Sequence, residues 1–109
     1  MLKFDERFNE TILDGTKKQT IRRHSRVFPG EIHACLNPPF QSNPFTWIEI
    51  VSVEIVEWDK ITNDDAKREG FAHRDDLHRF LKDAYPGTGF YIDTKLFVIH
   101  FELTEAPHD

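Results

Sequence analysis

Hydrophobic and polar residues follow different spacings in different parts of this chain, and each spacing predicts an element. Residues 47–58 are rich in Ile and Val, which is typical of a β-strand. The apolar positions change face partway along this segment, so we expect a bulge, a sharp coil or two successive strands. Alternation over residues 96–103 predicts a closing strand with one strongly apolar face.

Helical spacing is found in three shorter segments. Residues 6–14 end at Gly15, a typical helix stop, and predict a first helix. Thr62 and Asp65 have the spacing of a capping box, which predicts the start of a short second helix. Apolar residues repeat at helical spacing over residues 75–85, which predicts a third helix.

The remaining segments predict short strands and loops. We expect strands over residues 2–4, 20–23 and 31–36, and a loop over residues 37–46, which contain three prolines. Strands mixed with a few helices indicate the α+β class, with a sheet that curls into a barrel. At 109 residues, the chain is expected to form a single domain over residues 1–109.

Composition narrows the possible partners. The formal net charge is −5, which argues against a protein that coats duplex DNA, because such a protein must neutralise many phosphates. A modified nucleoside or a short single strand of RNA remains possible, since either needs only a local patch. No apolar run approaches a membrane span and no hydrophobic leader segment follows Met1, so we expect a cytoplasmic protein without membrane partners.

The cysteine and histidine residues argue against a redox or metal site. Cys35 is the single cysteine and lies in an apolar run, so we expect a buried and inert thiol in a reducing compartment. The six histidines lack paired metal-ligand spacing. We therefore expect no metal and no cofactor.

Basic residues are concentrated in one run. No acidic residue lies between Thr16 and Gly30, although the rest of the chain is strongly acidic. This run holds five of the 14 basic residues, namely Lys17, Lys18, Arg22, Arg23 and Arg26. A positive patch on a negative body indicates a binding site, and the alternative is a solvated strand edge guarded by lysines.

The spacing of Gly15, Lys17, Thr20 and Arg22 carries a family resemblance. It resembles the signature of the ASCH domain family, a group of small PUA-like β-barrels with flanking helices that is associated with RNA. Most of the family has glutamate where this chain has Thr20. Threonine at this position resembles the small bacterial branch that contains N4-acetylcytidine amidohydrolase.

A second motif extends this resemblance. Glu69 precedes a predicted helix that ends in Tyr85-Pro86-Gly87, as in the same branch. The resemblance implies that Thr20 is the nucleophile, Lys17 the proton acceptor and Glu69 the proton donor. The loops over residues 37–46 and 88–95 are longer than in that branch, so the fold and the catalytic positions transfer better than the substrate does.

The residues themselves fit this chemistry. A threonine hydroxyl is a weak nucleophile and needs a base, and the cations around Lys17 would lower its pKa toward the range of a base. Arg22 and Arg23 are candidates for binding an oxyanion or a phosphate, and Tyr91, Phe40 and other aromatics are candidates for stacking on a base. We expect an amidohydrolase acting on N4-acetylcytidine-type nucleosides. The alternative is a module that binds RNA and has no amidohydrolase activity. A ribonuclease is one version of this alternative.

Overall fold

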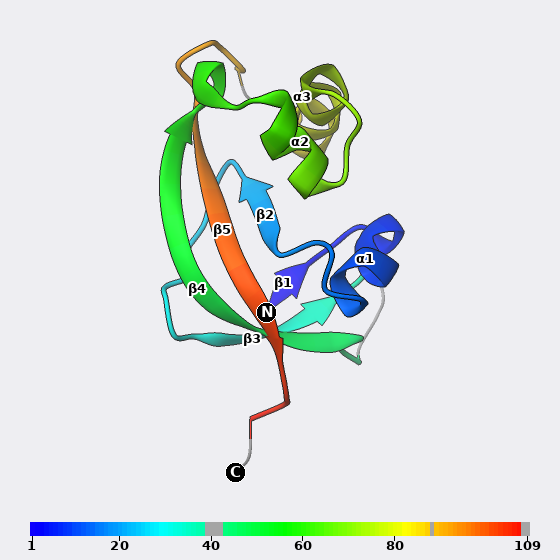
Figure 1. The fold of residues 1–109 in the computed structure, drawn as a ribbon. Coiled ribbons are helices and arrows are strands. Elements are labelled where there is room, and N and C mark those ends of the chain that lie inside the picture. Colours follow the sequence, from blue (N-terminus) through cyan, green and yellow to red (C-terminus); the bar gives the residue numbers. More distant parts are fainter. Residues whose placement is uncertain (39–42, 88, 108–109) are drawn as a thin grey trace.

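A single five-stranded sheet organises the molecule. The computed structural model describes residues 1–38, 43–87 and 89–107. The strand order in the sheet is β1-β3-β4-β5-β2 (Figure 1). The strands are β1 (Leu2–Lys3), β2 (Gln19–Arg22), β3 (Ile32–Leu36), β4 (Thr46–Glu57) and β5 (Lys95–Thr104).

The antiparallel pair β4–β5 forms a long curved ribbon along one side of the molecule (Figure 1). The register between the two strands shifts between Ile50 and Ser52. Side chains alternate between the two faces of a strand, so one extra residue shifts the inward-facing positions from even to odd residue numbers or the reverse. This bulge explains why the apolar pattern of residues 47–58 changes face, and the prediction of an irregularity there is confirmed.

The sheet curls into a half-barrel. Strand β1 pairs with β3 and strand β2 pairs with β5, so β1 and β2 are the two edges of the described sheet. The Arg22 guanidinium on β2 donates a hydrogen bond of 2.7 Å to the Lys3 carbonyl on β1. A side chain therefore links the two edges, where a closed barrel would have a backbone ladder.

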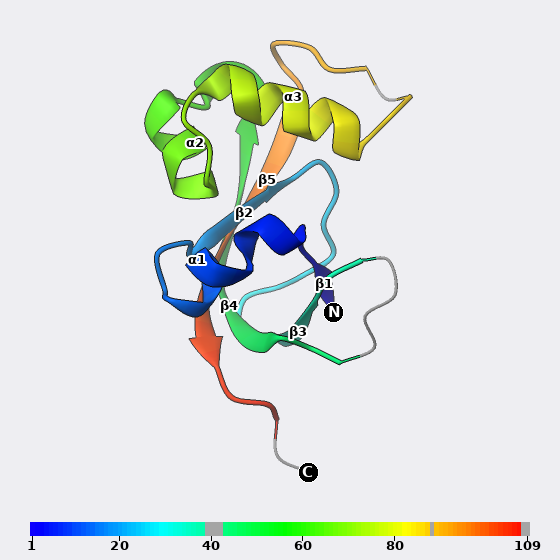
Figure 2. The ribbon, with the colours of Figure 1, turned by 90° about the vertical axis from the view of Figure 1, so that its right-hand side faces the viewer.

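The helices lie on the concave side of the β4–β5 ribbon. The predicted first helix consists of a 3₁₀ turn, η1 (Glu6–Phe8), followed by α1 (Asn9–Leu13). In Figure 2, α1 lies in front of the sheet, and α2 (Asn63–Glu69) and α3 (Arg74–Ala84) lie at its upper end. A second 3₁₀ turn, η2 (Trp58–Lys60), leads from β4 toward α2. No helix in the described parts of the chain is long and apolar enough to cross a membrane.

The ends of α2 follow the sequence signals. Thr62 and Asp65 form the predicted capping box, in which each side chain accepts a hydrogen bond from the other residue's backbone N–H. The helix ends at Gly70, whose φ of 108° is left-handed. The capping box and the glycine set where α2 begins and ends, and so fix the place of its last residue, Glu69.

The core fills the space between the concave face of the sheet and the helices. Its fully or almost fully buried members come from α1, β4, β5 and α3, and include Ile12, Ile48, Ile50, Ile99, Phe101, Leu77 and Leu81. Cys35 on β3 is also fully buried, and this burial raises the pKa of its thiol to about 12. Burial thus favours the neutral thiol, and the prediction of a buried cysteine is confirmed.

Two glycines give a matched test of how α2 meets the first helix. Gly15 and Gly70 both have positive φ, but a Cβ on Gly15 would have no neighbour within 4 Å, whereas a Cβ on Gly70 would lie 3.0 Å from Cε1 of Phe8. We expect Gly15→Ala to lower the free energy of unfolding by about 1 kcal/mol. Gly70→Ala should lower it by about 3 kcal/mol, because overpacking adds to the backbone cost. Urea denaturation measures both values, and equal losses would contradict this packing.

Candidate functional site

One cavity lies between the edge of the sheet and the helices. Its volume is about 620 Å³, within the range of small-molecule sites. Lys17, Thr20, Arg22 and Glu69 all line it. Residues from the turn after α1, from β2 and from the end of α2 therefore meet in one place, although Glu69 lies far from the others in sequence.

Local structure explains how the first part of the chain reaches this cavity. The chain turns after α1 at Gly15, and the Lys17 N–H donates a hydrogen bond of 2.9 Å to the Thr11 carbonyl. Strand β2 begins two residues later. Side chains alternate along a strand, so Thr20 and Arg22 point to the same side of β2.

Lys17 and Glu69 form a buried pair in the cavity wall. Lys17 is 3% exposed and Glu69 is 4% exposed. The Lys17 Nζ lies 3.3 Å from Oε2 of Glu69 and donates a hydrogen bond of 2.6 Å to the Glu69 backbone carbonyl. The ammonium also lies over the ring of Phe8, 4.6 Å from its centroid. Two ionisable groups are thus held in contact, almost completely shielded from water.

Burial moves the two pKa values toward each other. It lowers the pKa of Lys17, and the nearby Arg22 and Arg7 lower it further, while Glu69 opposes the change. Burial raises the pKa of Glu69, and Lys17, the Ile21 N–H and Gln19 oppose this change. The cations near Lys17 act in the predicted direction, but loss of hydration is the larger cause. Both shifts favour the neutral amine and the neutral carboxyl group.

Thr20 and Arg22 form a second contact in the same cavity. The Arg22 Nε donates a hydrogen bond of 3.1 Å to the Thr20 Oγ1, and Thr20 is 4% exposed. Arg22 also packs over the ring of Phe4, with 4.9 Å between the guanidinium carbon and the ring centroid. Partial burial lowers the pKa of Arg22, but a guanidinium stays cationic at neutral pH. Because Arg22 donates to the Thr20 oxygen, the hydroxyl proton remains available to another acceptor.

No hydrogen bond joins Lys17 to the Thr20 hydroxyl within the described parts of the chain. The Lys17 Nζ hydrogen bonds only to the carbonyl and the carboxylate of Glu69 among the described residues. Catalytic hydrogen bonds are often incomplete before a substrate binds. The two groups line one cavity, so a rotation of the lysine chain is the movement that would bring them together.

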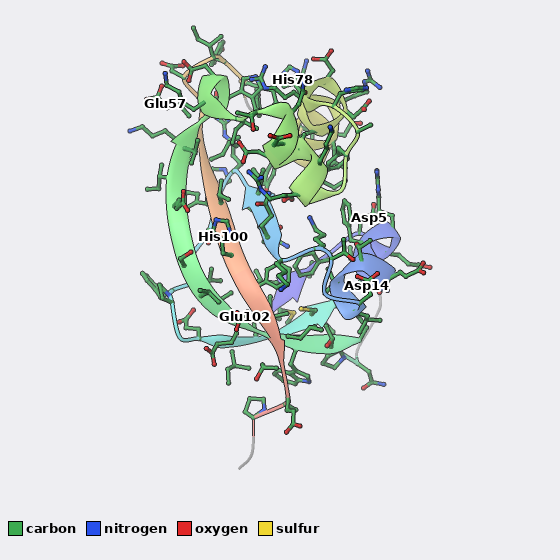
Figure 3. All side chains as sticks on the ribbon, in the orientation of Figure 1. Asp5, Asp14, Glu57, His78, His100 and Glu102 are labelled. Atoms are coloured by element: carbon green, nitrogen blue, oxygen red, sulfur yellow. The ribbon has the colours of Figure 1, made fainter. Side chains whose placement is uncertain are left out.

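Charges around the cavity are balanced. Three basic residues line it, namely Lys3, Lys17 and Arg22, together with three acidic residues, Asp5, Glu69 and Asp83. Other acidic residues belong to the β4–β5 ribbon, where Glu49 faces Glu102 across the strands. Figure 3 shows Glu57, His100 and Glu102 along this ribbon and Asp5 beside the first helix. The described lining of the cavity therefore has no net formal charge, unlike the basic run, which supplies Lys17 and Arg22.

Two of the predicted binding residues lie elsewhere. Arg23 follows the last residue of β2 and packs over Phe90, 5.9 Å from the ring centroid, outside the lining of the cavity. Tyr91 is 68% exposed in the turn before β5, and its N–H donates a hydrogen bond to the Thr94 Oγ1. Neither residue lines the cavity. Phe40, another stacking candidate, lies among residues 39–42, outside the described part of the chain.

Sequence reasoning missed other residues of the site. Gln19 is 3% exposed and contacts Glu69 behind the cavity wall. Phe4, Phe8, Phe80 and Tyr85 supply aromatic surface to the cavity itself. The helical spacing of residues 75–85 indicates burial of Phe80 and Tyr85, but it carries no signal that they would line the same cavity as Lys17. In the described residues, no group of three His, Cys, Asp or Glu side chains could hold a metal ion.

Comparison with solved structures supports the fold. A protein from Enterococcus faecalis with the family model DUF984 superposes with a TM-score of 0.73 at 24% identity, over 90% of this chain and 67% of that chain. The ASCH domain from Lactobacillus crispatus gives a TM-score of 0.69 at 22% identity, over 87% of this chain and 69% of that chain. The hypothetical protein PH0355 gives a TM-score of 0.69 at 13% identity, over 94% and 95% of the two chains.

Sequence comparison identifies the family. A comparison with curated proteins gives no match. A family model described as the ASCH domain matches residues 2–105, which is nearly the whole chain. The half-barrel with its helices also agrees with the solved ASCH domain. This chain belongs to the ASCH domain family, which has a PUA-like fold.

Proposed function

We propose that this protein is an amidohydrolase that removes the acyl group from an N4-acylated cytosine nucleoside. The observation that carries the proposal is the buried Lys17–Glu69 pair, with 3.3 Å between Nζ and Oε2, in a cavity that also contains the Thr20 hydroxyl. Amide hydrolysis needs a nucleophile, a base to activate it and an acid to protonate the departing amine. These three groups line one wall of a cavity of suitable size.

The Lys17–Glu69 contact supplies a way to prepare the base and the acid in one event. A proton that moves from the Lys17 ammonium to the Glu69 carboxylate leaves a neutral amine and a neutral carboxyl group. Burial favours this neutral form of each group, and a bound substrate would exclude the remaining water and favour it further. After the transfer, Lys17 can accept a proton and Glu69 can donate one.

The first half of the reaction forms an ester on Thr20. Lys17 accepts the hydroxyl proton of Thr20, and the Thr20 oxygen forms a bond to the acyl carbon. The Nε of Arg22 lies 3.1 Å from the Thr20 oxygen. From there Arg22 stabilises the negative charge that develops on the former carbonyl oxygen of the acyl group. The intermediate collapses, the bond from the acyl carbon to N4 breaks, and N4 takes the proton of Glu69. Cytidine leaves.

The second half restores the enzyme. Water attacks the ester carbon and gives one proton to the Glu69 carboxylate. The ester bond to Thr20 breaks, and the Thr20 oxygen takes back the proton held by Lys17. The products are a carboxylic acid, which ionises in solution, and the starting form of the three residues. Every step uses groups of this chain, the substrate and one water molecule.

The cavity favours a nucleoside over an RNA strand. Its charges are balanced, so it lacks the positive field that attracts a phosphate backbone. Of the five cations in the basic run, Lys17 is buried against Glu69, and Arg22 is committed to the Lys3 carbonyl and to Thr20. Aromatic side chains, including Phe80 and Tyr85, offer flat surfaces for a pyrimidine ring.

The test compares a free nucleoside with the same base in RNA. We expect deacetylation of N4-acetylcytidine, followed by chromatography, and much slower or no reaction of a short single-stranded RNA carrying the same modified base. Binding of unmodified RNA should be weak at physiological salt. RNA binding that is tight and falls steeply as salt rises, with no cytidine formed, would instead favour the RNA-binding alternative.

A further inference from the structure

Gln19 is buried beside Glu69 but does not line the cavity. It is 3% exposed and is the first residue of β2. Its Nε2 lies 3.3 Å from Oε1 of Glu69 and 3.3 Å from the backbone carbonyl of Asp65. Asp65 and Glu69 are one turn apart on α2 and so lie on the same face of the helix. The amide group of Gln19 therefore connects the start of β2 to two residues of α2 through hydrogen bonds.

The chemistry of the two neighbours fixes the direction of the amide. A backbone carbonyl and a carboxylate oxygen both accept hydrogen bonds, so the Gln19 nitrogen, which carries two protons, must face them. The reversed amide would place an acceptor against two acceptors. Gln19 thus donates to Glu69, and this donation favours the charged carboxylate at Oε1.

The two oxygens of Glu69 have different partners. Oε2 accepts a hydrogen bond of 2.8 Å from the Ile21 N–H and lies 3.3 Å from the Lys17 Nζ. Oε1 is held by Gln19. The plane of the carboxyl group is therefore set by contacts at both oxygens. Removal of Gln19 would leave it free to rotate about its contact with Ile21.

We propose that Gln19 is a positioning residue, which holds the Glu69 carboxyl group in the plane that faces Lys17. Gln19 does not line the cavity, so it acts through Glu69 and not on a substrate. The contact itself stands apart from the proposed function, whereas its effect on rate rests on that function.

The charged groups around Glu69 come from several elements. Lys17 lies before β2, Arg22 lies on β2, and Arg7 in η1 acts on Lys17. Asp65 lies one turn away on α2 and is occupied by Thr62 and Arg68. None of these contacts is removed by a change at Gln19. The Glu69 carboxyl group therefore reports the loss of the Gln19 amide directly.

The experiment uses Gln19→Met, which keeps the length of the side chain and removes the donor. NMR titration of the Glu69 carboxyl carbon should show a higher midpoint in Gln19→Met than in the parent, because a donor to the charged form is lost. In the deacetylation assay, kcat/KM should fall about tenfold, mainly through kcat. Gln19→Glu is the second variant, since a second carboxyl group at this position also raises the Glu69 midpoint.

Thr94→Val is the matched control. Thr94 is buried, and its Oγ1 accepts a hydrogen bond of 2.7 Å from the Tyr91 N–H, away from the cavity. It should lower stability to a similar extent without moving the Glu69 midpoint. An unchanged midpoint in Gln19→Met and Gln19→Glu, or a shift no larger than in Thr94→Val, would overturn the proposal. A shifted Glu69 midpoint in a protein that does not deacylate any N4-acylated cytidine would support the positioning role and overturn the proposed function.

Discussion

Replacing Lys17 by methionine should destabilise the protein by about 3 kcal/mol at neutral pH, because removal of one partner leaves a buried charge without compensation. Glu69→Gln should cost a similar amount, since the buried Lys17 ammonium would lose the negative charge that compensates it. The double variant Lys17→Met/Glu69→Gln should lose no more than either single variant. Urea denaturation of all four proteins gives the coupling energy.

The stability lost in Lys17→Met should depend on pH. In Lys17→Met, the pKa of Glu69 rises further above its unfolded value, because the cation that opposed burial is gone. A raised folded pKa contributes stability that is lost as pH rises through it. The loss in Lys17→Met should therefore be small at about pH 5 and large at about pH 8. Equal losses at both values, or strictly additive losses in the double variant, would contradict a coupled buried pair.

Replacing Thr20 by valine should lower kcat/KM for N4-acetylcytidine by about a thousandfold or more, because valine has the same shape and no nucleophilic oxygen. Thr20→Ser is the matched variant, since it keeps the oxygen and removes only a methyl group. We expect it to retain activity within about tenfold of the parent.

Stability separates a chemical role from a structural one at Thr20. Within the described parts of the chain, the Thr20 hydroxyl accepts one hydrogen bond, from the Nε of Arg22 at 3.1 Å, so Thr20→Val should cost only about 1 kcal/mol of unfolding free energy. A rate loss that follows the stability loss, or a valine variant as active as the serine variant, would remove Thr20 from the proposed mechanism.

Local signals in the sequence predicted much of the fold. The Thr62–Asp65 capping box and the glycine at position 15 act within a few residues, so each is visible in sequence. The change of face in residues 47–58 predicted an irregularity that the register shift after Ile50 explains. The predicted barrel is an open half-barrel, because whether the two edge strands pair depends on long-range geometry that no local pattern encodes.

The site was less visible. Lys17, Thr20 and Arg22 are close in sequence, so their proximity in space was expected, while Glu69 reaches them only through the packing of α2 against β2. The family resemblance, and not spacing, pointed to Glu69. The basic run predicted a positive patch, but its Lys17 is buried and paired with the Glu69 carboxylate. A lone glutamine such as Gln19 carries no sequence signal at all.

Conversion of N4-acetylcytidine by the purified protein tests the central claim most directly. We expect cytidine and acetate to form in equal amounts over many turnovers, as followed by chromatography of both products. We expect Thr20→Val to form neither product above the uncatalysed rate. A folded protein that leaves N4-acetylcytidine intact, or a Thr20→Val variant that releases cytidine as fast as the parent, would contradict the central claim.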